Sequence, residues 1–297
     1  MMTAQSVIRG QGGQLVTRFA PSPTGALHQG HAFSAILAHD IAMAAGGRFL
    51  LRIEDIDGTR SRPEHVDTIL ADLTWLGLTW EGPVFQSHRL DRYAAALVRL
   101  RGLGLVYPCF CTRAEIAASL SAPHPGEDVV YPGTCRMLPP EERAARMTAP
   151  HCWRLDMTAA LARVDCDLIW HDARVGRIAA DPAPQGDVVL ARKDAPASYH
   201  LAVTIDDAAQ GVTDVVRGVD LFAATHVHRL LQALLDLPTP RYHHHALLTD
   251  THGERLAKRR GSASLKALRE AGADGRAVAR AIRDAIAKSP EKPTLGT

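Results

Sequence analysis

Residues 21–31, Pro-Ser-Pro-Thr-Gly-Ala-Leu-His-Gln-Gly-His, combine turn-forming residues with two histidines. A stretch rich in β-formers (15–20) precedes them and an alanine-rich apolar stretch (32–45) comes after them, so we expect a strand that turns into a helix. His28 and His31 are spaced at i and i+3, so both can point at one phosphate group. The exposed amides of a helix start also favour anions. The segment therefore predicts a site for ATP phosphates, although either histidine alone could equally be a cap or a surface residue.

Three of the five cysteines, Cys109, Cys111 and Cys135, lie in a segment rich in proline and glycine. Two thiolates one residue apart and a third across a loop can form three corners of a tetrahedral zinc site. The alternative is a set of three buried, reduced thiols. Cys152 and Cys166 fall outside the set, and we expect them to be core or surface thiols. Five cysteines in 297 residues do not form the pattern of a disulfide framework.

The elements that must position these residues alternate between strands and helices. A second strand at 48–54 comes after the first helix, and the resulting right-handed βαβ unit is typical of dinucleotide-type folds. Prolines between residues 107 and 153 interrupt this pattern, which indicates an insertion between two halves of a sheet. The other expected elements are helices at 63–76, 90–103 and 223–235, buried strands of the second half at 187–191, 200–205 and 214–217, and one or two helices after a basic run at 255–260.

Composition sets broad limits on the class of protein. With 46% hydrophobic and 22% charged residues, the chain can bury an ordinary core. A net charge of +2 neither marks nor excludes a nucleic-acid-binding protein. No apolar run reaches the roughly 18 residues of a membrane span, and residues 1–14 lack the apolar core of a signal peptide. We therefore expect a globular, cytoplasmic protein without a membrane segment.

The string at residues 21–31 resembles the HIGH signature of class I aminoacyl-tRNA synthetases, in the form found in the glutamate and glutamine enzymes. The run Arg255-Leu256-Ala257-Lys258-Arg259 resembles the mobile basic loop of that class, with arginine in place of the usual first lysine and alanine in place of serine. The resemblance implies that ATP is a substrate and that Mg²⁺ accompanies it. It assigns ATP binding to His28, Gly30, His31 and Lys258, and the catalytic positive charge to His28, His31 and Lys258.

The same resemblance implies a pocket for L-glutamate at the carboxyl ends of neighbouring strands. Glu54 matches the residue that faces the amino group, and Arg217 lies in Val216-Arg217-Gly218-Val219-Asp220-Leu221, which resembles the strand-end arginine motif of the family. Val227-His228 stands where the family usually carries an Arg-Gln pair. The glutamate-binding residues that the resemblance implies are Arg18, Phe19, Ala20, Pro21, Ser22, Glu54, Tyr199 and Arg217.

Two further features are interpreted through the family. His244 matches a histidine that is common in synthetases, and we expect His243 and His245 to be surface residues rather than parts of a metal site. The Cys-x-Cys pair and the Tyr-x-x-x-Cys set resemble the zinc site of the glutamyl-tRNA synthetase paralogues that modify tRNA. This resemblance implies one structural zinc ion held by Cys109, Cys111, Tyr131 and Cys135. His124 is a chemically better zinc ligand than a tyrosine and remains an alternative to Tyr131.

The predicted fold is α/β, a Rossmann-like parallel sheet of the class I synthetase type with an inserted zinc-binding, acceptor-type subdomain and a short helical C-terminal region. The first half of the catalytic domain is expected at residues 1–106 and its second half at 186–240. The insertion is expected at 107–185. The basic loop and the short helices are expected at 241–297.

The number of residues after the basic run indicates which molecule accepts the activated glutamate. Glutamyl-tRNA synthetases continue with a long helical region that reads the anticodon, and residues 261–297 leave no room for one. We therefore expect a monomer, resembling the paralogues that transfer activated glutamate to the queuosine base in the anticodon of tRNA(Asp). Two alternatives are a compact glutamyl-tRNA synthetase that charges tRNA(Glu) and a non-catalytic paralogue that binds tRNA.

Overall fold

The first sheet of the protein is parallel. The computed structural model describes residues 13–118, 130–247 and 263–288. The sheet consists of β1 (Val16–Phe19), β2 (Arg48–Ile53) and β3 (Glu81–Phe85), with β2 in the middle. α1 (Gln29–Ala44) connects β1 to β2, and α2 (Pro63–Trp75) lies between β2 and β3 in the chain. The βαβ unit predicted around the histidine segment is therefore confirmed.

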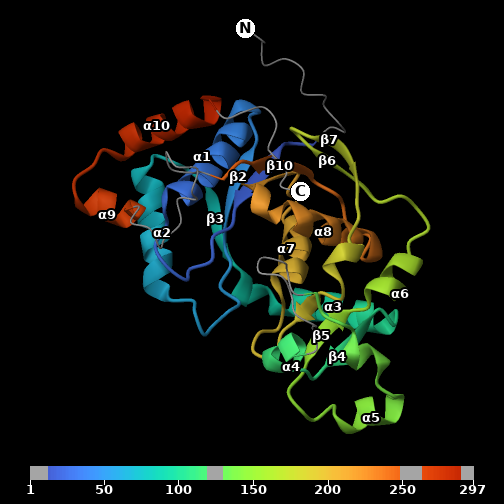
Figure 1. Cartoon of the computed structure of the whole chain (residues 1–297). Coiled ribbons are helices and arrows are strands. Elements are labelled where there is room, and N and C mark those ends of the chain that lie inside the picture. The colour runs from blue at the N-terminus through green and yellow to red at the C-terminus, as the bar shows by residue number, and fades with distance from the viewer. Residues whose placement is uncertain (1–12, 119–129, 248–262, 289–297) are drawn as a thin grey trace.

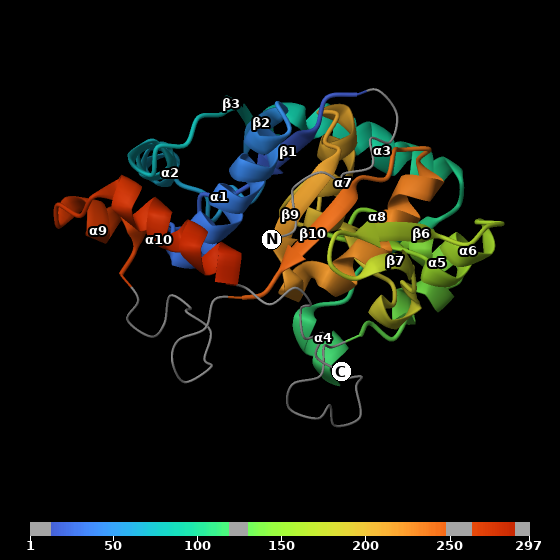
Figure 2. The ribbon, with the colours of Figure 1, turned by 90° about the horizontal axis from the view of Figure 1, so that it is seen from above.

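A second sheet continues the first. It contains β9 (Asp214–Gly218), β10 (Arg241–His245), β6 (Ile169–Asp172) and β7 (Gly176–Ala179). β10 runs parallel to both β9 and β6, whereas β7 is antiparallel to β6. The amide of Thr213 donates to the carbonyl of Val16 at 2.9 Å, which joins the beginnings of β9 and β1. The parallel strands thus have the order β3-β2-β1-β9-β10-β6 of a doubly wound sheet, with its reversal between β1 and β9 (Figure 2).

A third, antiparallel sheet forms a separate end of the molecule. It consists of β4 (Val106–Cys109), β5 (Cys152–Leu155) and β8 (Val189–Ala191). α4 (Arg113–Ala118) and α5 (Pro140–Ala145) lie near this sheet, and α6 (Met157–Ala162) comes directly after β5 in the chain (Figure 1). The expected insertion at 107–185 thus supplies most of β4 and all of β5 to this sheet, and β6 and β7 to the second sheet. The domain boundaries themselves stay a prediction.

Two of the predicted strands need correction. The strand expected at 200–205 is wrong, because this segment belongs to the helix α7 (Tyr199–Ala209). Six of the eleven residues of α7 are buried, and a short apolar run does not distinguish a buried helix from a buried strand. The strand expected at 187–191 exists as β8, but it pairs with β5 rather than with the second half of the parallel sheet. The predicted strand at 214–217 is confirmed as β9.

The remaining predicted helices are present. α3 (Leu90–Gly102) and α8 (Phe222–Leu234) pack with α7 in one hydrophobic cluster. α9 (Leu265–Glu270) and α10 (Gly275–Lys288) lie beside α2 and α1 (Figure 2). The indole of Trp75 donates to the carbonyl of Ala273 at 3.1 Å, and Arg283 forms an ion pair with Asp40 at 2.7 Å. The terminal helices therefore belong to the catalytic body.

Candidate active site and metal centre

A cleft of about 590 Å³ opens where the strand order of the parallel sheet reverses. Strands β1 and β9 end at its wall, and ligands of doubly wound sheets bind at such a switch point. The structure brings together on this cleft every predicted ATP-site and glutamate-site residue that it describes: Arg18, Phe19, Ala20, Pro21, Ser22, His28, Gly30, His31, Glu54, Tyr199 and Arg217. The other predicted residue, Lys258, lies outside the described residues.

His28 and His31 cap the first turn of α1 at the edge of the cleft. The Gly30 amide donates to Nδ1 of His28 at 3.1 Å, and the His28 amide donates to Nδ1 of His31 at 3.2 Å. Because an amide can only donate, Nδ1 is the acceptor in both rings and the neutral rings carry their protons on Nε2. A Cβ atom at residue 30 would lie 2.9 Å from the His28 ring, so this arrangement requires glycine. Both rings thus carry N–H donors suited to phosphate oxygens at the positive end of a helix.

Arg18 is held in place by a carboxylate. Its Nε and Nη2 atoms donate to the two oxygens of Asp207 at 3.0 and 3.3 Å, and Nη1 donates to the carbonyl of Val216 at 3.2 Å. Arg52 donates to the same carboxylate at 2.8 Å. Burial raises the pKa of Asp207, but the charges of Arg18 and Arg52 outweigh this effect and lower the pKa overall. The charge of Arg18 is therefore already balanced by a neighbour.

Glu54 contributes a negative group to the cleft, directly after the end of β2. Its carboxylate is 3.4 Å from Nη2 of Arg52, and its side chain is 11% exposed. Burial raises the pKa of Glu54, and the nearby charges of Arg52 and Arg18 offset this rise only in part. A positively charged group placed in the cleft would favour the ionised form of Glu54.

Arg217, at the end of β9, is a buried cation that also lines the cleft, and it is 5% exposed. Its Nε donates to Nε2 of His244 at 3.1 Å, and its Nη2 donates to Oγ1 of Thr225 at 2.5 Å. Its Nη1 donates to the hydroxyl of Tyr199 at 3.1 Å and to Nδ1 of His228 at 3.3 Å. Four of the five N–H groups of the guanidinium thus reach neutral partners, and no carboxylate among the described residues forms an ion pair with it.

The histidines around Arg217 are fixed as neutral tautomers. His228 accepts from Arg217 at Nδ1, so its Nε2 is the donor to Nδ1 of His200 at 3.2 Å. His244 accepts at Nε2, so its Nδ1 is the donor to Asp172 at 2.8 Å. Burial, together with the charge of Arg217, lowers the pKa of His200 and of His244 to about 4 and that of His228 well below its ordinary value. All three rings therefore stay neutral at neutral pH.

Sequence reasoning missed several parts of this network. Asp172, His200 and Thr225 have no local signal. Thr225 contacts Arg217 directly, whereas Asp172 and His200 reach it through His244 and His228, so the network joins β6, β10, α7, α8 and β9. The expectation of a surface position for His245 is wrong, since this residue is 4% exposed and its Nε2 lies 2.7 Å from the hydroxyl of Ser34. His243 is half-buried and contacts Asp214 at 2.7 Å.

A smaller cavity of about 130 Å³ adjoins the cleft, and Ser22, Glu54 and Tyr199 line both. Its outer wall carries Arg60 and Arg192, which both form ion pairs with Asp57, at 2.7 and 3.4 Å. The next residue, Lys193, donates from Nζ to the carbonyls of Phe110 and Cys111 at 2.9 and 3.1 Å. This lysine therefore connects the wall of the smaller cavity to the cysteine segment.

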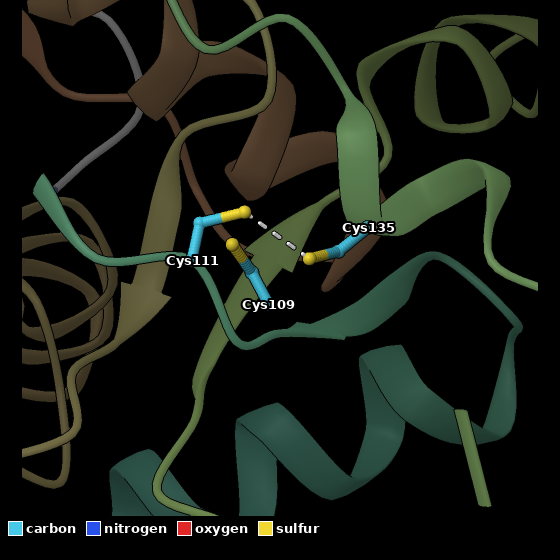
Figure 3. Close-up of side chains that lie close together, drawn as sticks. All are labelled: Cys109, Cys111 and Cys135. Carbon is cyan, nitrogen blue, oxygen red and sulfur yellow. Dashed lines mark hydrogen bonds between the residues drawn. The ribbon is translucent and has the colours of Figure 1, made fainter. Parts of the chain in front are cut away.

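The predicted cysteine set is brought together by the fold. The sulfur atoms of Cys109, Cys111 and Cys135 all lie within 4.8 Å of one another, and those of Cys111 and Cys135 are 3.4 Å apart (Figure 3). Two sulfurs bound to one tetrahedral zinc ion at about 2.3 Å would be about 3.8 Å apart, so the three thiols fit this metal. The set could therefore bind zinc.

Tyr131 and Cys152 are the described groups next to this cluster. The hydroxyl of Tyr131 lies 3.6 Å from Sγ of Cys111 and accepts a hydrogen bond from the amide of Cys135 at 2.8 Å. Cys152 faces Cys109 directly across the β4–β5 ladder, and its thiol lowers the pKa of Cys109. Cys152 is buried, as expected for a core thiol, and Cys166 is exposed. The alternative ligand His124 lies outside the described residues.

The cleft lies at the switch point of an α/β sheet, with the paired histidines at its edge, and comparison with known proteins identifies the family. Residues 14–290 match the family model "tRNA synthetases class I (E and Q), catalytic domain". The chain therefore belongs to the class I tRNA synthetases of the glutamate and glutamine type. Among the described residues, no helix has the length and apolar character needed to cross a membrane.

Two relatives that cover most of this chain carry the same name. The chain is 50% identical over 280 residues to the glutamyl-Q tRNA(Asp) synthetase of Rhodobacter capsulatus, covering 90% of this chain and 99% of the relative. It is 45% identical over 269 residues to the glutamyl-Q tRNA(Asp) synthetase of Symbiobacterium thermophilum, covering 87% of this chain and 82% of the relative.

Solved structures of glutamate enzymes share the fold. The glutamate-tRNA synthetase of Elizabethkingia anophelis superposes with a TM-score of 0.71 at 28% identity, over 83% of this chain and 53% of the other. A glutamate tRNA ligase from Elizabethkingia meningosepticum, in complex with its amino acid, gives 0.69 at 26% identity, over 88% and 53%. The chain thus spans about half the length of these two proteins.

Proposed function

We propose that the protein activates L-glutamate with ATP and transfers the glutamyl group to the queuosine base in the anticodon of tRNA(Asp). The proposal combines the cleft with the relatives named glutamyl-Q tRNA(Asp) synthetase. The single observation that carries the choice of amino acid is the buried Arg217, whose hydrogen-bond partners are all neutral.

The charges of the cleft match those of glutamate. Arg18 is balanced by Asp207, so Arg217 is the buried cation left to pair with an anionic group of the substrate. Glu54 lines the same cleft and supplies a carboxylate for an ammonium group. The hydroxyl of Tyr199 accepts from Arg217, which leaves its own proton available to donate to a carboxylate. Glutamate supplies two carboxylates and one ammonium group. Glutamine lacks the second carboxylate and would leave a buried charge unpaired.

The first step is formation of an adenylate. A carboxylate oxygen of glutamate attacks the α-phosphorus of ATP in line, a C–O–P bond forms, and the bond to pyrophosphate breaks. His28 and His31 would donate to the phosphate oxygens as charge develops, and Lys258 would add a cation from the basic loop. Mg²⁺ is expected to accompany ATP. No general base is needed in this step, because the nucleophile is already ionised.

The second step is transfer to the tRNA. A hydroxyl of the queuosine cyclopentenediol attacks the glutamyl carbonyl and an ester bond forms. AMP leaves with the electron pair of the broken C–O bond, and the hydroxyl proton passes to the departing phosphate or to water. The smaller cavity shares Ser22, Glu54 and Tyr199 with the cleft, which gives an acceptor group a place next to the reacting carbonyl. We further propose that the enzyme acts in the cytoplasm as a monomer.

The cysteine set is proposed to hold one structural zinc ion. Cys109, Cys111 and Cys135 would provide three ligands, and the fourth would be Tyr131. The closed, largely buried surroundings favour a structural role, since a catalytic zinc ion keeps an open position for water or substrate. The ion would fix the loops of the inserted subdomain relative to one another.

Amino-acid-dependent exchange of labelled pyrophosphate into ATP tests the first step. We expect exchange with glutamate and at least about a hundredfold less with glutamine, because a buried charge without its partner is costly. Aspartate should also give less exchange, because its side chain is one methylene group shorter and holds its carboxylate farther from Arg217. Equal exchange with glutamine would contradict the assignment of Arg217. No exchange with any amino acid would favour the non-catalytic alternative.

A further inference from the structure

A row of rings and guanidinium groups runs from the inserted subdomain to the end of α3. The guanidinium of Arg146 lies 5.7 Å from the ring of Phe110, whose centroid is 5.6 Å from that of His151. The row continues from His151 to Trp153 at 5.3 Å, and Arg101 lies 4.2 Å above the Trp153 ring. We call these five residues the aromatic stripe.

The alternation of residues in the antiparallel β4–β5 pair explains why Trp153 points away from the cysteine cluster. Tyr107, Cys109 and Cys152 point to one face, where they pack with the cysteine cluster. Trp153 pairs with Pro108 on the opposite face. The stripe residues Phe110, His151 and Trp153 are half-buried, whereas Arg101 and Arg146 are exposed. Each aromatic group is therefore exposed in part, although Phe110 also packs against the cysteine cluster, and the two arginines at the ends of the stripe carry positive charge.

We propose that the aromatic stripe stacks unpaired nucleotides of RNA, the loop nucleotides of the tRNA that presents its base to the cleft. Aromatic rings and arginine planes bind unstacked bases in this way, and arginine adds attraction for the phosphates. The inference rests on the proposed function only in that RNA is the partner.

Charge and position both favour this occupant. The stripe and its neighbour Lys193 supply three cations, Arg101, Arg146 and Lys193. The nearby carboxylates are Glu142, which pairs with Arg146 at 3.6 Å, and Glu115, which caps the amide of Thr112. The end of the stripe at Phe110 accepts the hydrogen bond of Lys193, and the preceding residue, Arg192, lines the smaller cavity. An RNA strand that places one nucleotide in the smaller cavity can therefore extend from there over the aromatic stripe.

The test measures binding of a fluorescein-labelled anticodon stem-loop of tRNA(Asp) by fluorescence anisotropy, with a fully paired RNA duplex for comparison. Trp153→Leu keeps an apolar side chain but removes the stacking surface, and we expect it to weaken stem-loop binding at least about fivefold. Trp153→Phe keeps a ring and should stay within about twofold of the unaltered protein. Binding of the duplex should not change in either variant.

Two further variants guard against effects on folding. Arg101→Gln should also weaken stem-loop binding, because it removes a cation and a stacking plane from an exposed residue. His151→Ala is compared with His88→Ala, which removes an exposed histidine that contacts Phe85 at 5.4 Å, outside the stripe. Only the former should weaken binding.

The outcomes separate this inference from the proposed function. Unchanged stem-loop binding in Trp153→Leu and Arg101→Gln would overturn the stripe, as would equal losses in Trp153→Phe and Trp153→Leu. Glutamate-dependent pyrophosphate exchange without RNA is measured in the same variants and should not change. If exchange is absent in the unaltered protein while RNA binding depends on the stripe, the proposed function fails and the stripe stands.

Discussion

Nε of Arg217 donates to Nε2 of His244 at 3.1 Å, and this bond determines where the proton of the imidazole lies. With Nε2 as acceptor, Nδ1 of His244 donates to Asp172 at 2.8 Å. The guanidinium is thus positioned by a chain that begins on β6 and passes through β10 to β9. On the other side, His228 and His200 extend the same order of donors and acceptors. The fold therefore fixes the orientation of Arg217, the residue predicted to bind glutamate.

Replacement of Asp172 tests this chain. Oδ2 of Asp172 accepts from the amide and Nδ1 of His244, and Oδ1 accepts from the amides of Arg174 and Val175. Asp172→Asn places an NH₂ group against donors alone, which costs about 1–3 kcal/mol. We expect the KM for glutamate to rise roughly tenfold with little change in the KM for ATP. Asp214→Asn, which affects the pairing of half-buried His243, is the matched control and should leave both constants unchanged.

Replacement of Arg217 tests the charge match. Arg217→Gln keeps a donor but removes the buried cation, and we expect kcat/KM for glutamate to fall at least about a hundredfold, corresponding to about 3–5 kcal/mol. Selectivity between glutamate and glutamine in pyrophosphate exchange should shrink by a similar factor. A variant that still strongly prefers glutamate would show that another group recognises the side-chain carboxylate.

The neutral histidines predict loss of stability in acid. The ordinary pKa of histidine, 6.5, is lowered in the folded protein to about 4 for both His200 and His244. The unfolded chain therefore binds more protons between these values, and the free energy of unfolding should decrease as the pH falls from about 6.5 to about 4. Urea denaturation at several pH values measures this slope. His200→Gln should make it shallower, and an unchanged slope would contradict the neutral state of His200.

Removal of the metal tests the cysteine site. We expect about one zinc ion per chain by elemental analysis, and Cys135→Ser should lower both the zinc content and the melting temperature. Tyr131→Phe removes the proposed fourth ligand and keeps the ring beneath Arg154, which lies 3.9 Å away. This variant should bind zinc more weakly than the unaltered protein. If His124→Ala weakens zinc binding and Tyr131→Phe does not, histidine is the fourth ligand.

The parts of the fold that could be predicted from sequence are those with local patterns. The strand before Pro21, the helix after His28 and the strand after Gly47 carry turn residues and apolar periodicity, and the structure contains all three. The segments without such patterns were missed. β3 begins Glu-Gly-Pro and is partly exposed, and β10, Arg-Tyr-His-His-His, has the composition of a surface segment although three of its five residues are buried.

The residues of the candidate site also divide into those that a sequence motif predicts and those that only tertiary packing brings together. Residues in the histidine string and at the strand ends could be placed from motif resemblance, and the structure gathers those it describes on one cleft. The residues that position Arg217 could not be placed, because tertiary packing brings them together. Thr225 contacts Arg217 directly, and His200 and Asp172 act on it through His228 and His244. The mistaken strand at 200–205 also concealed that Tyr199 and His200 begin a helix at the wall of the cleft.

The central claim concerns the acceptor of the glutamyl group. Purified protein is incubated with ATP, radiolabelled glutamate and one of three RNAs: tRNA(Asp) carrying queuosine, tRNA(Asp) lacking it, and tRNA(Glu). We predict label on the first RNA only, in an ester that is lost when the queuosine diol is oxidised with periodate beforehand. Labelling of tRNA(Glu) alone would contradict the account and identify a compact glutamyl-tRNA synthetase.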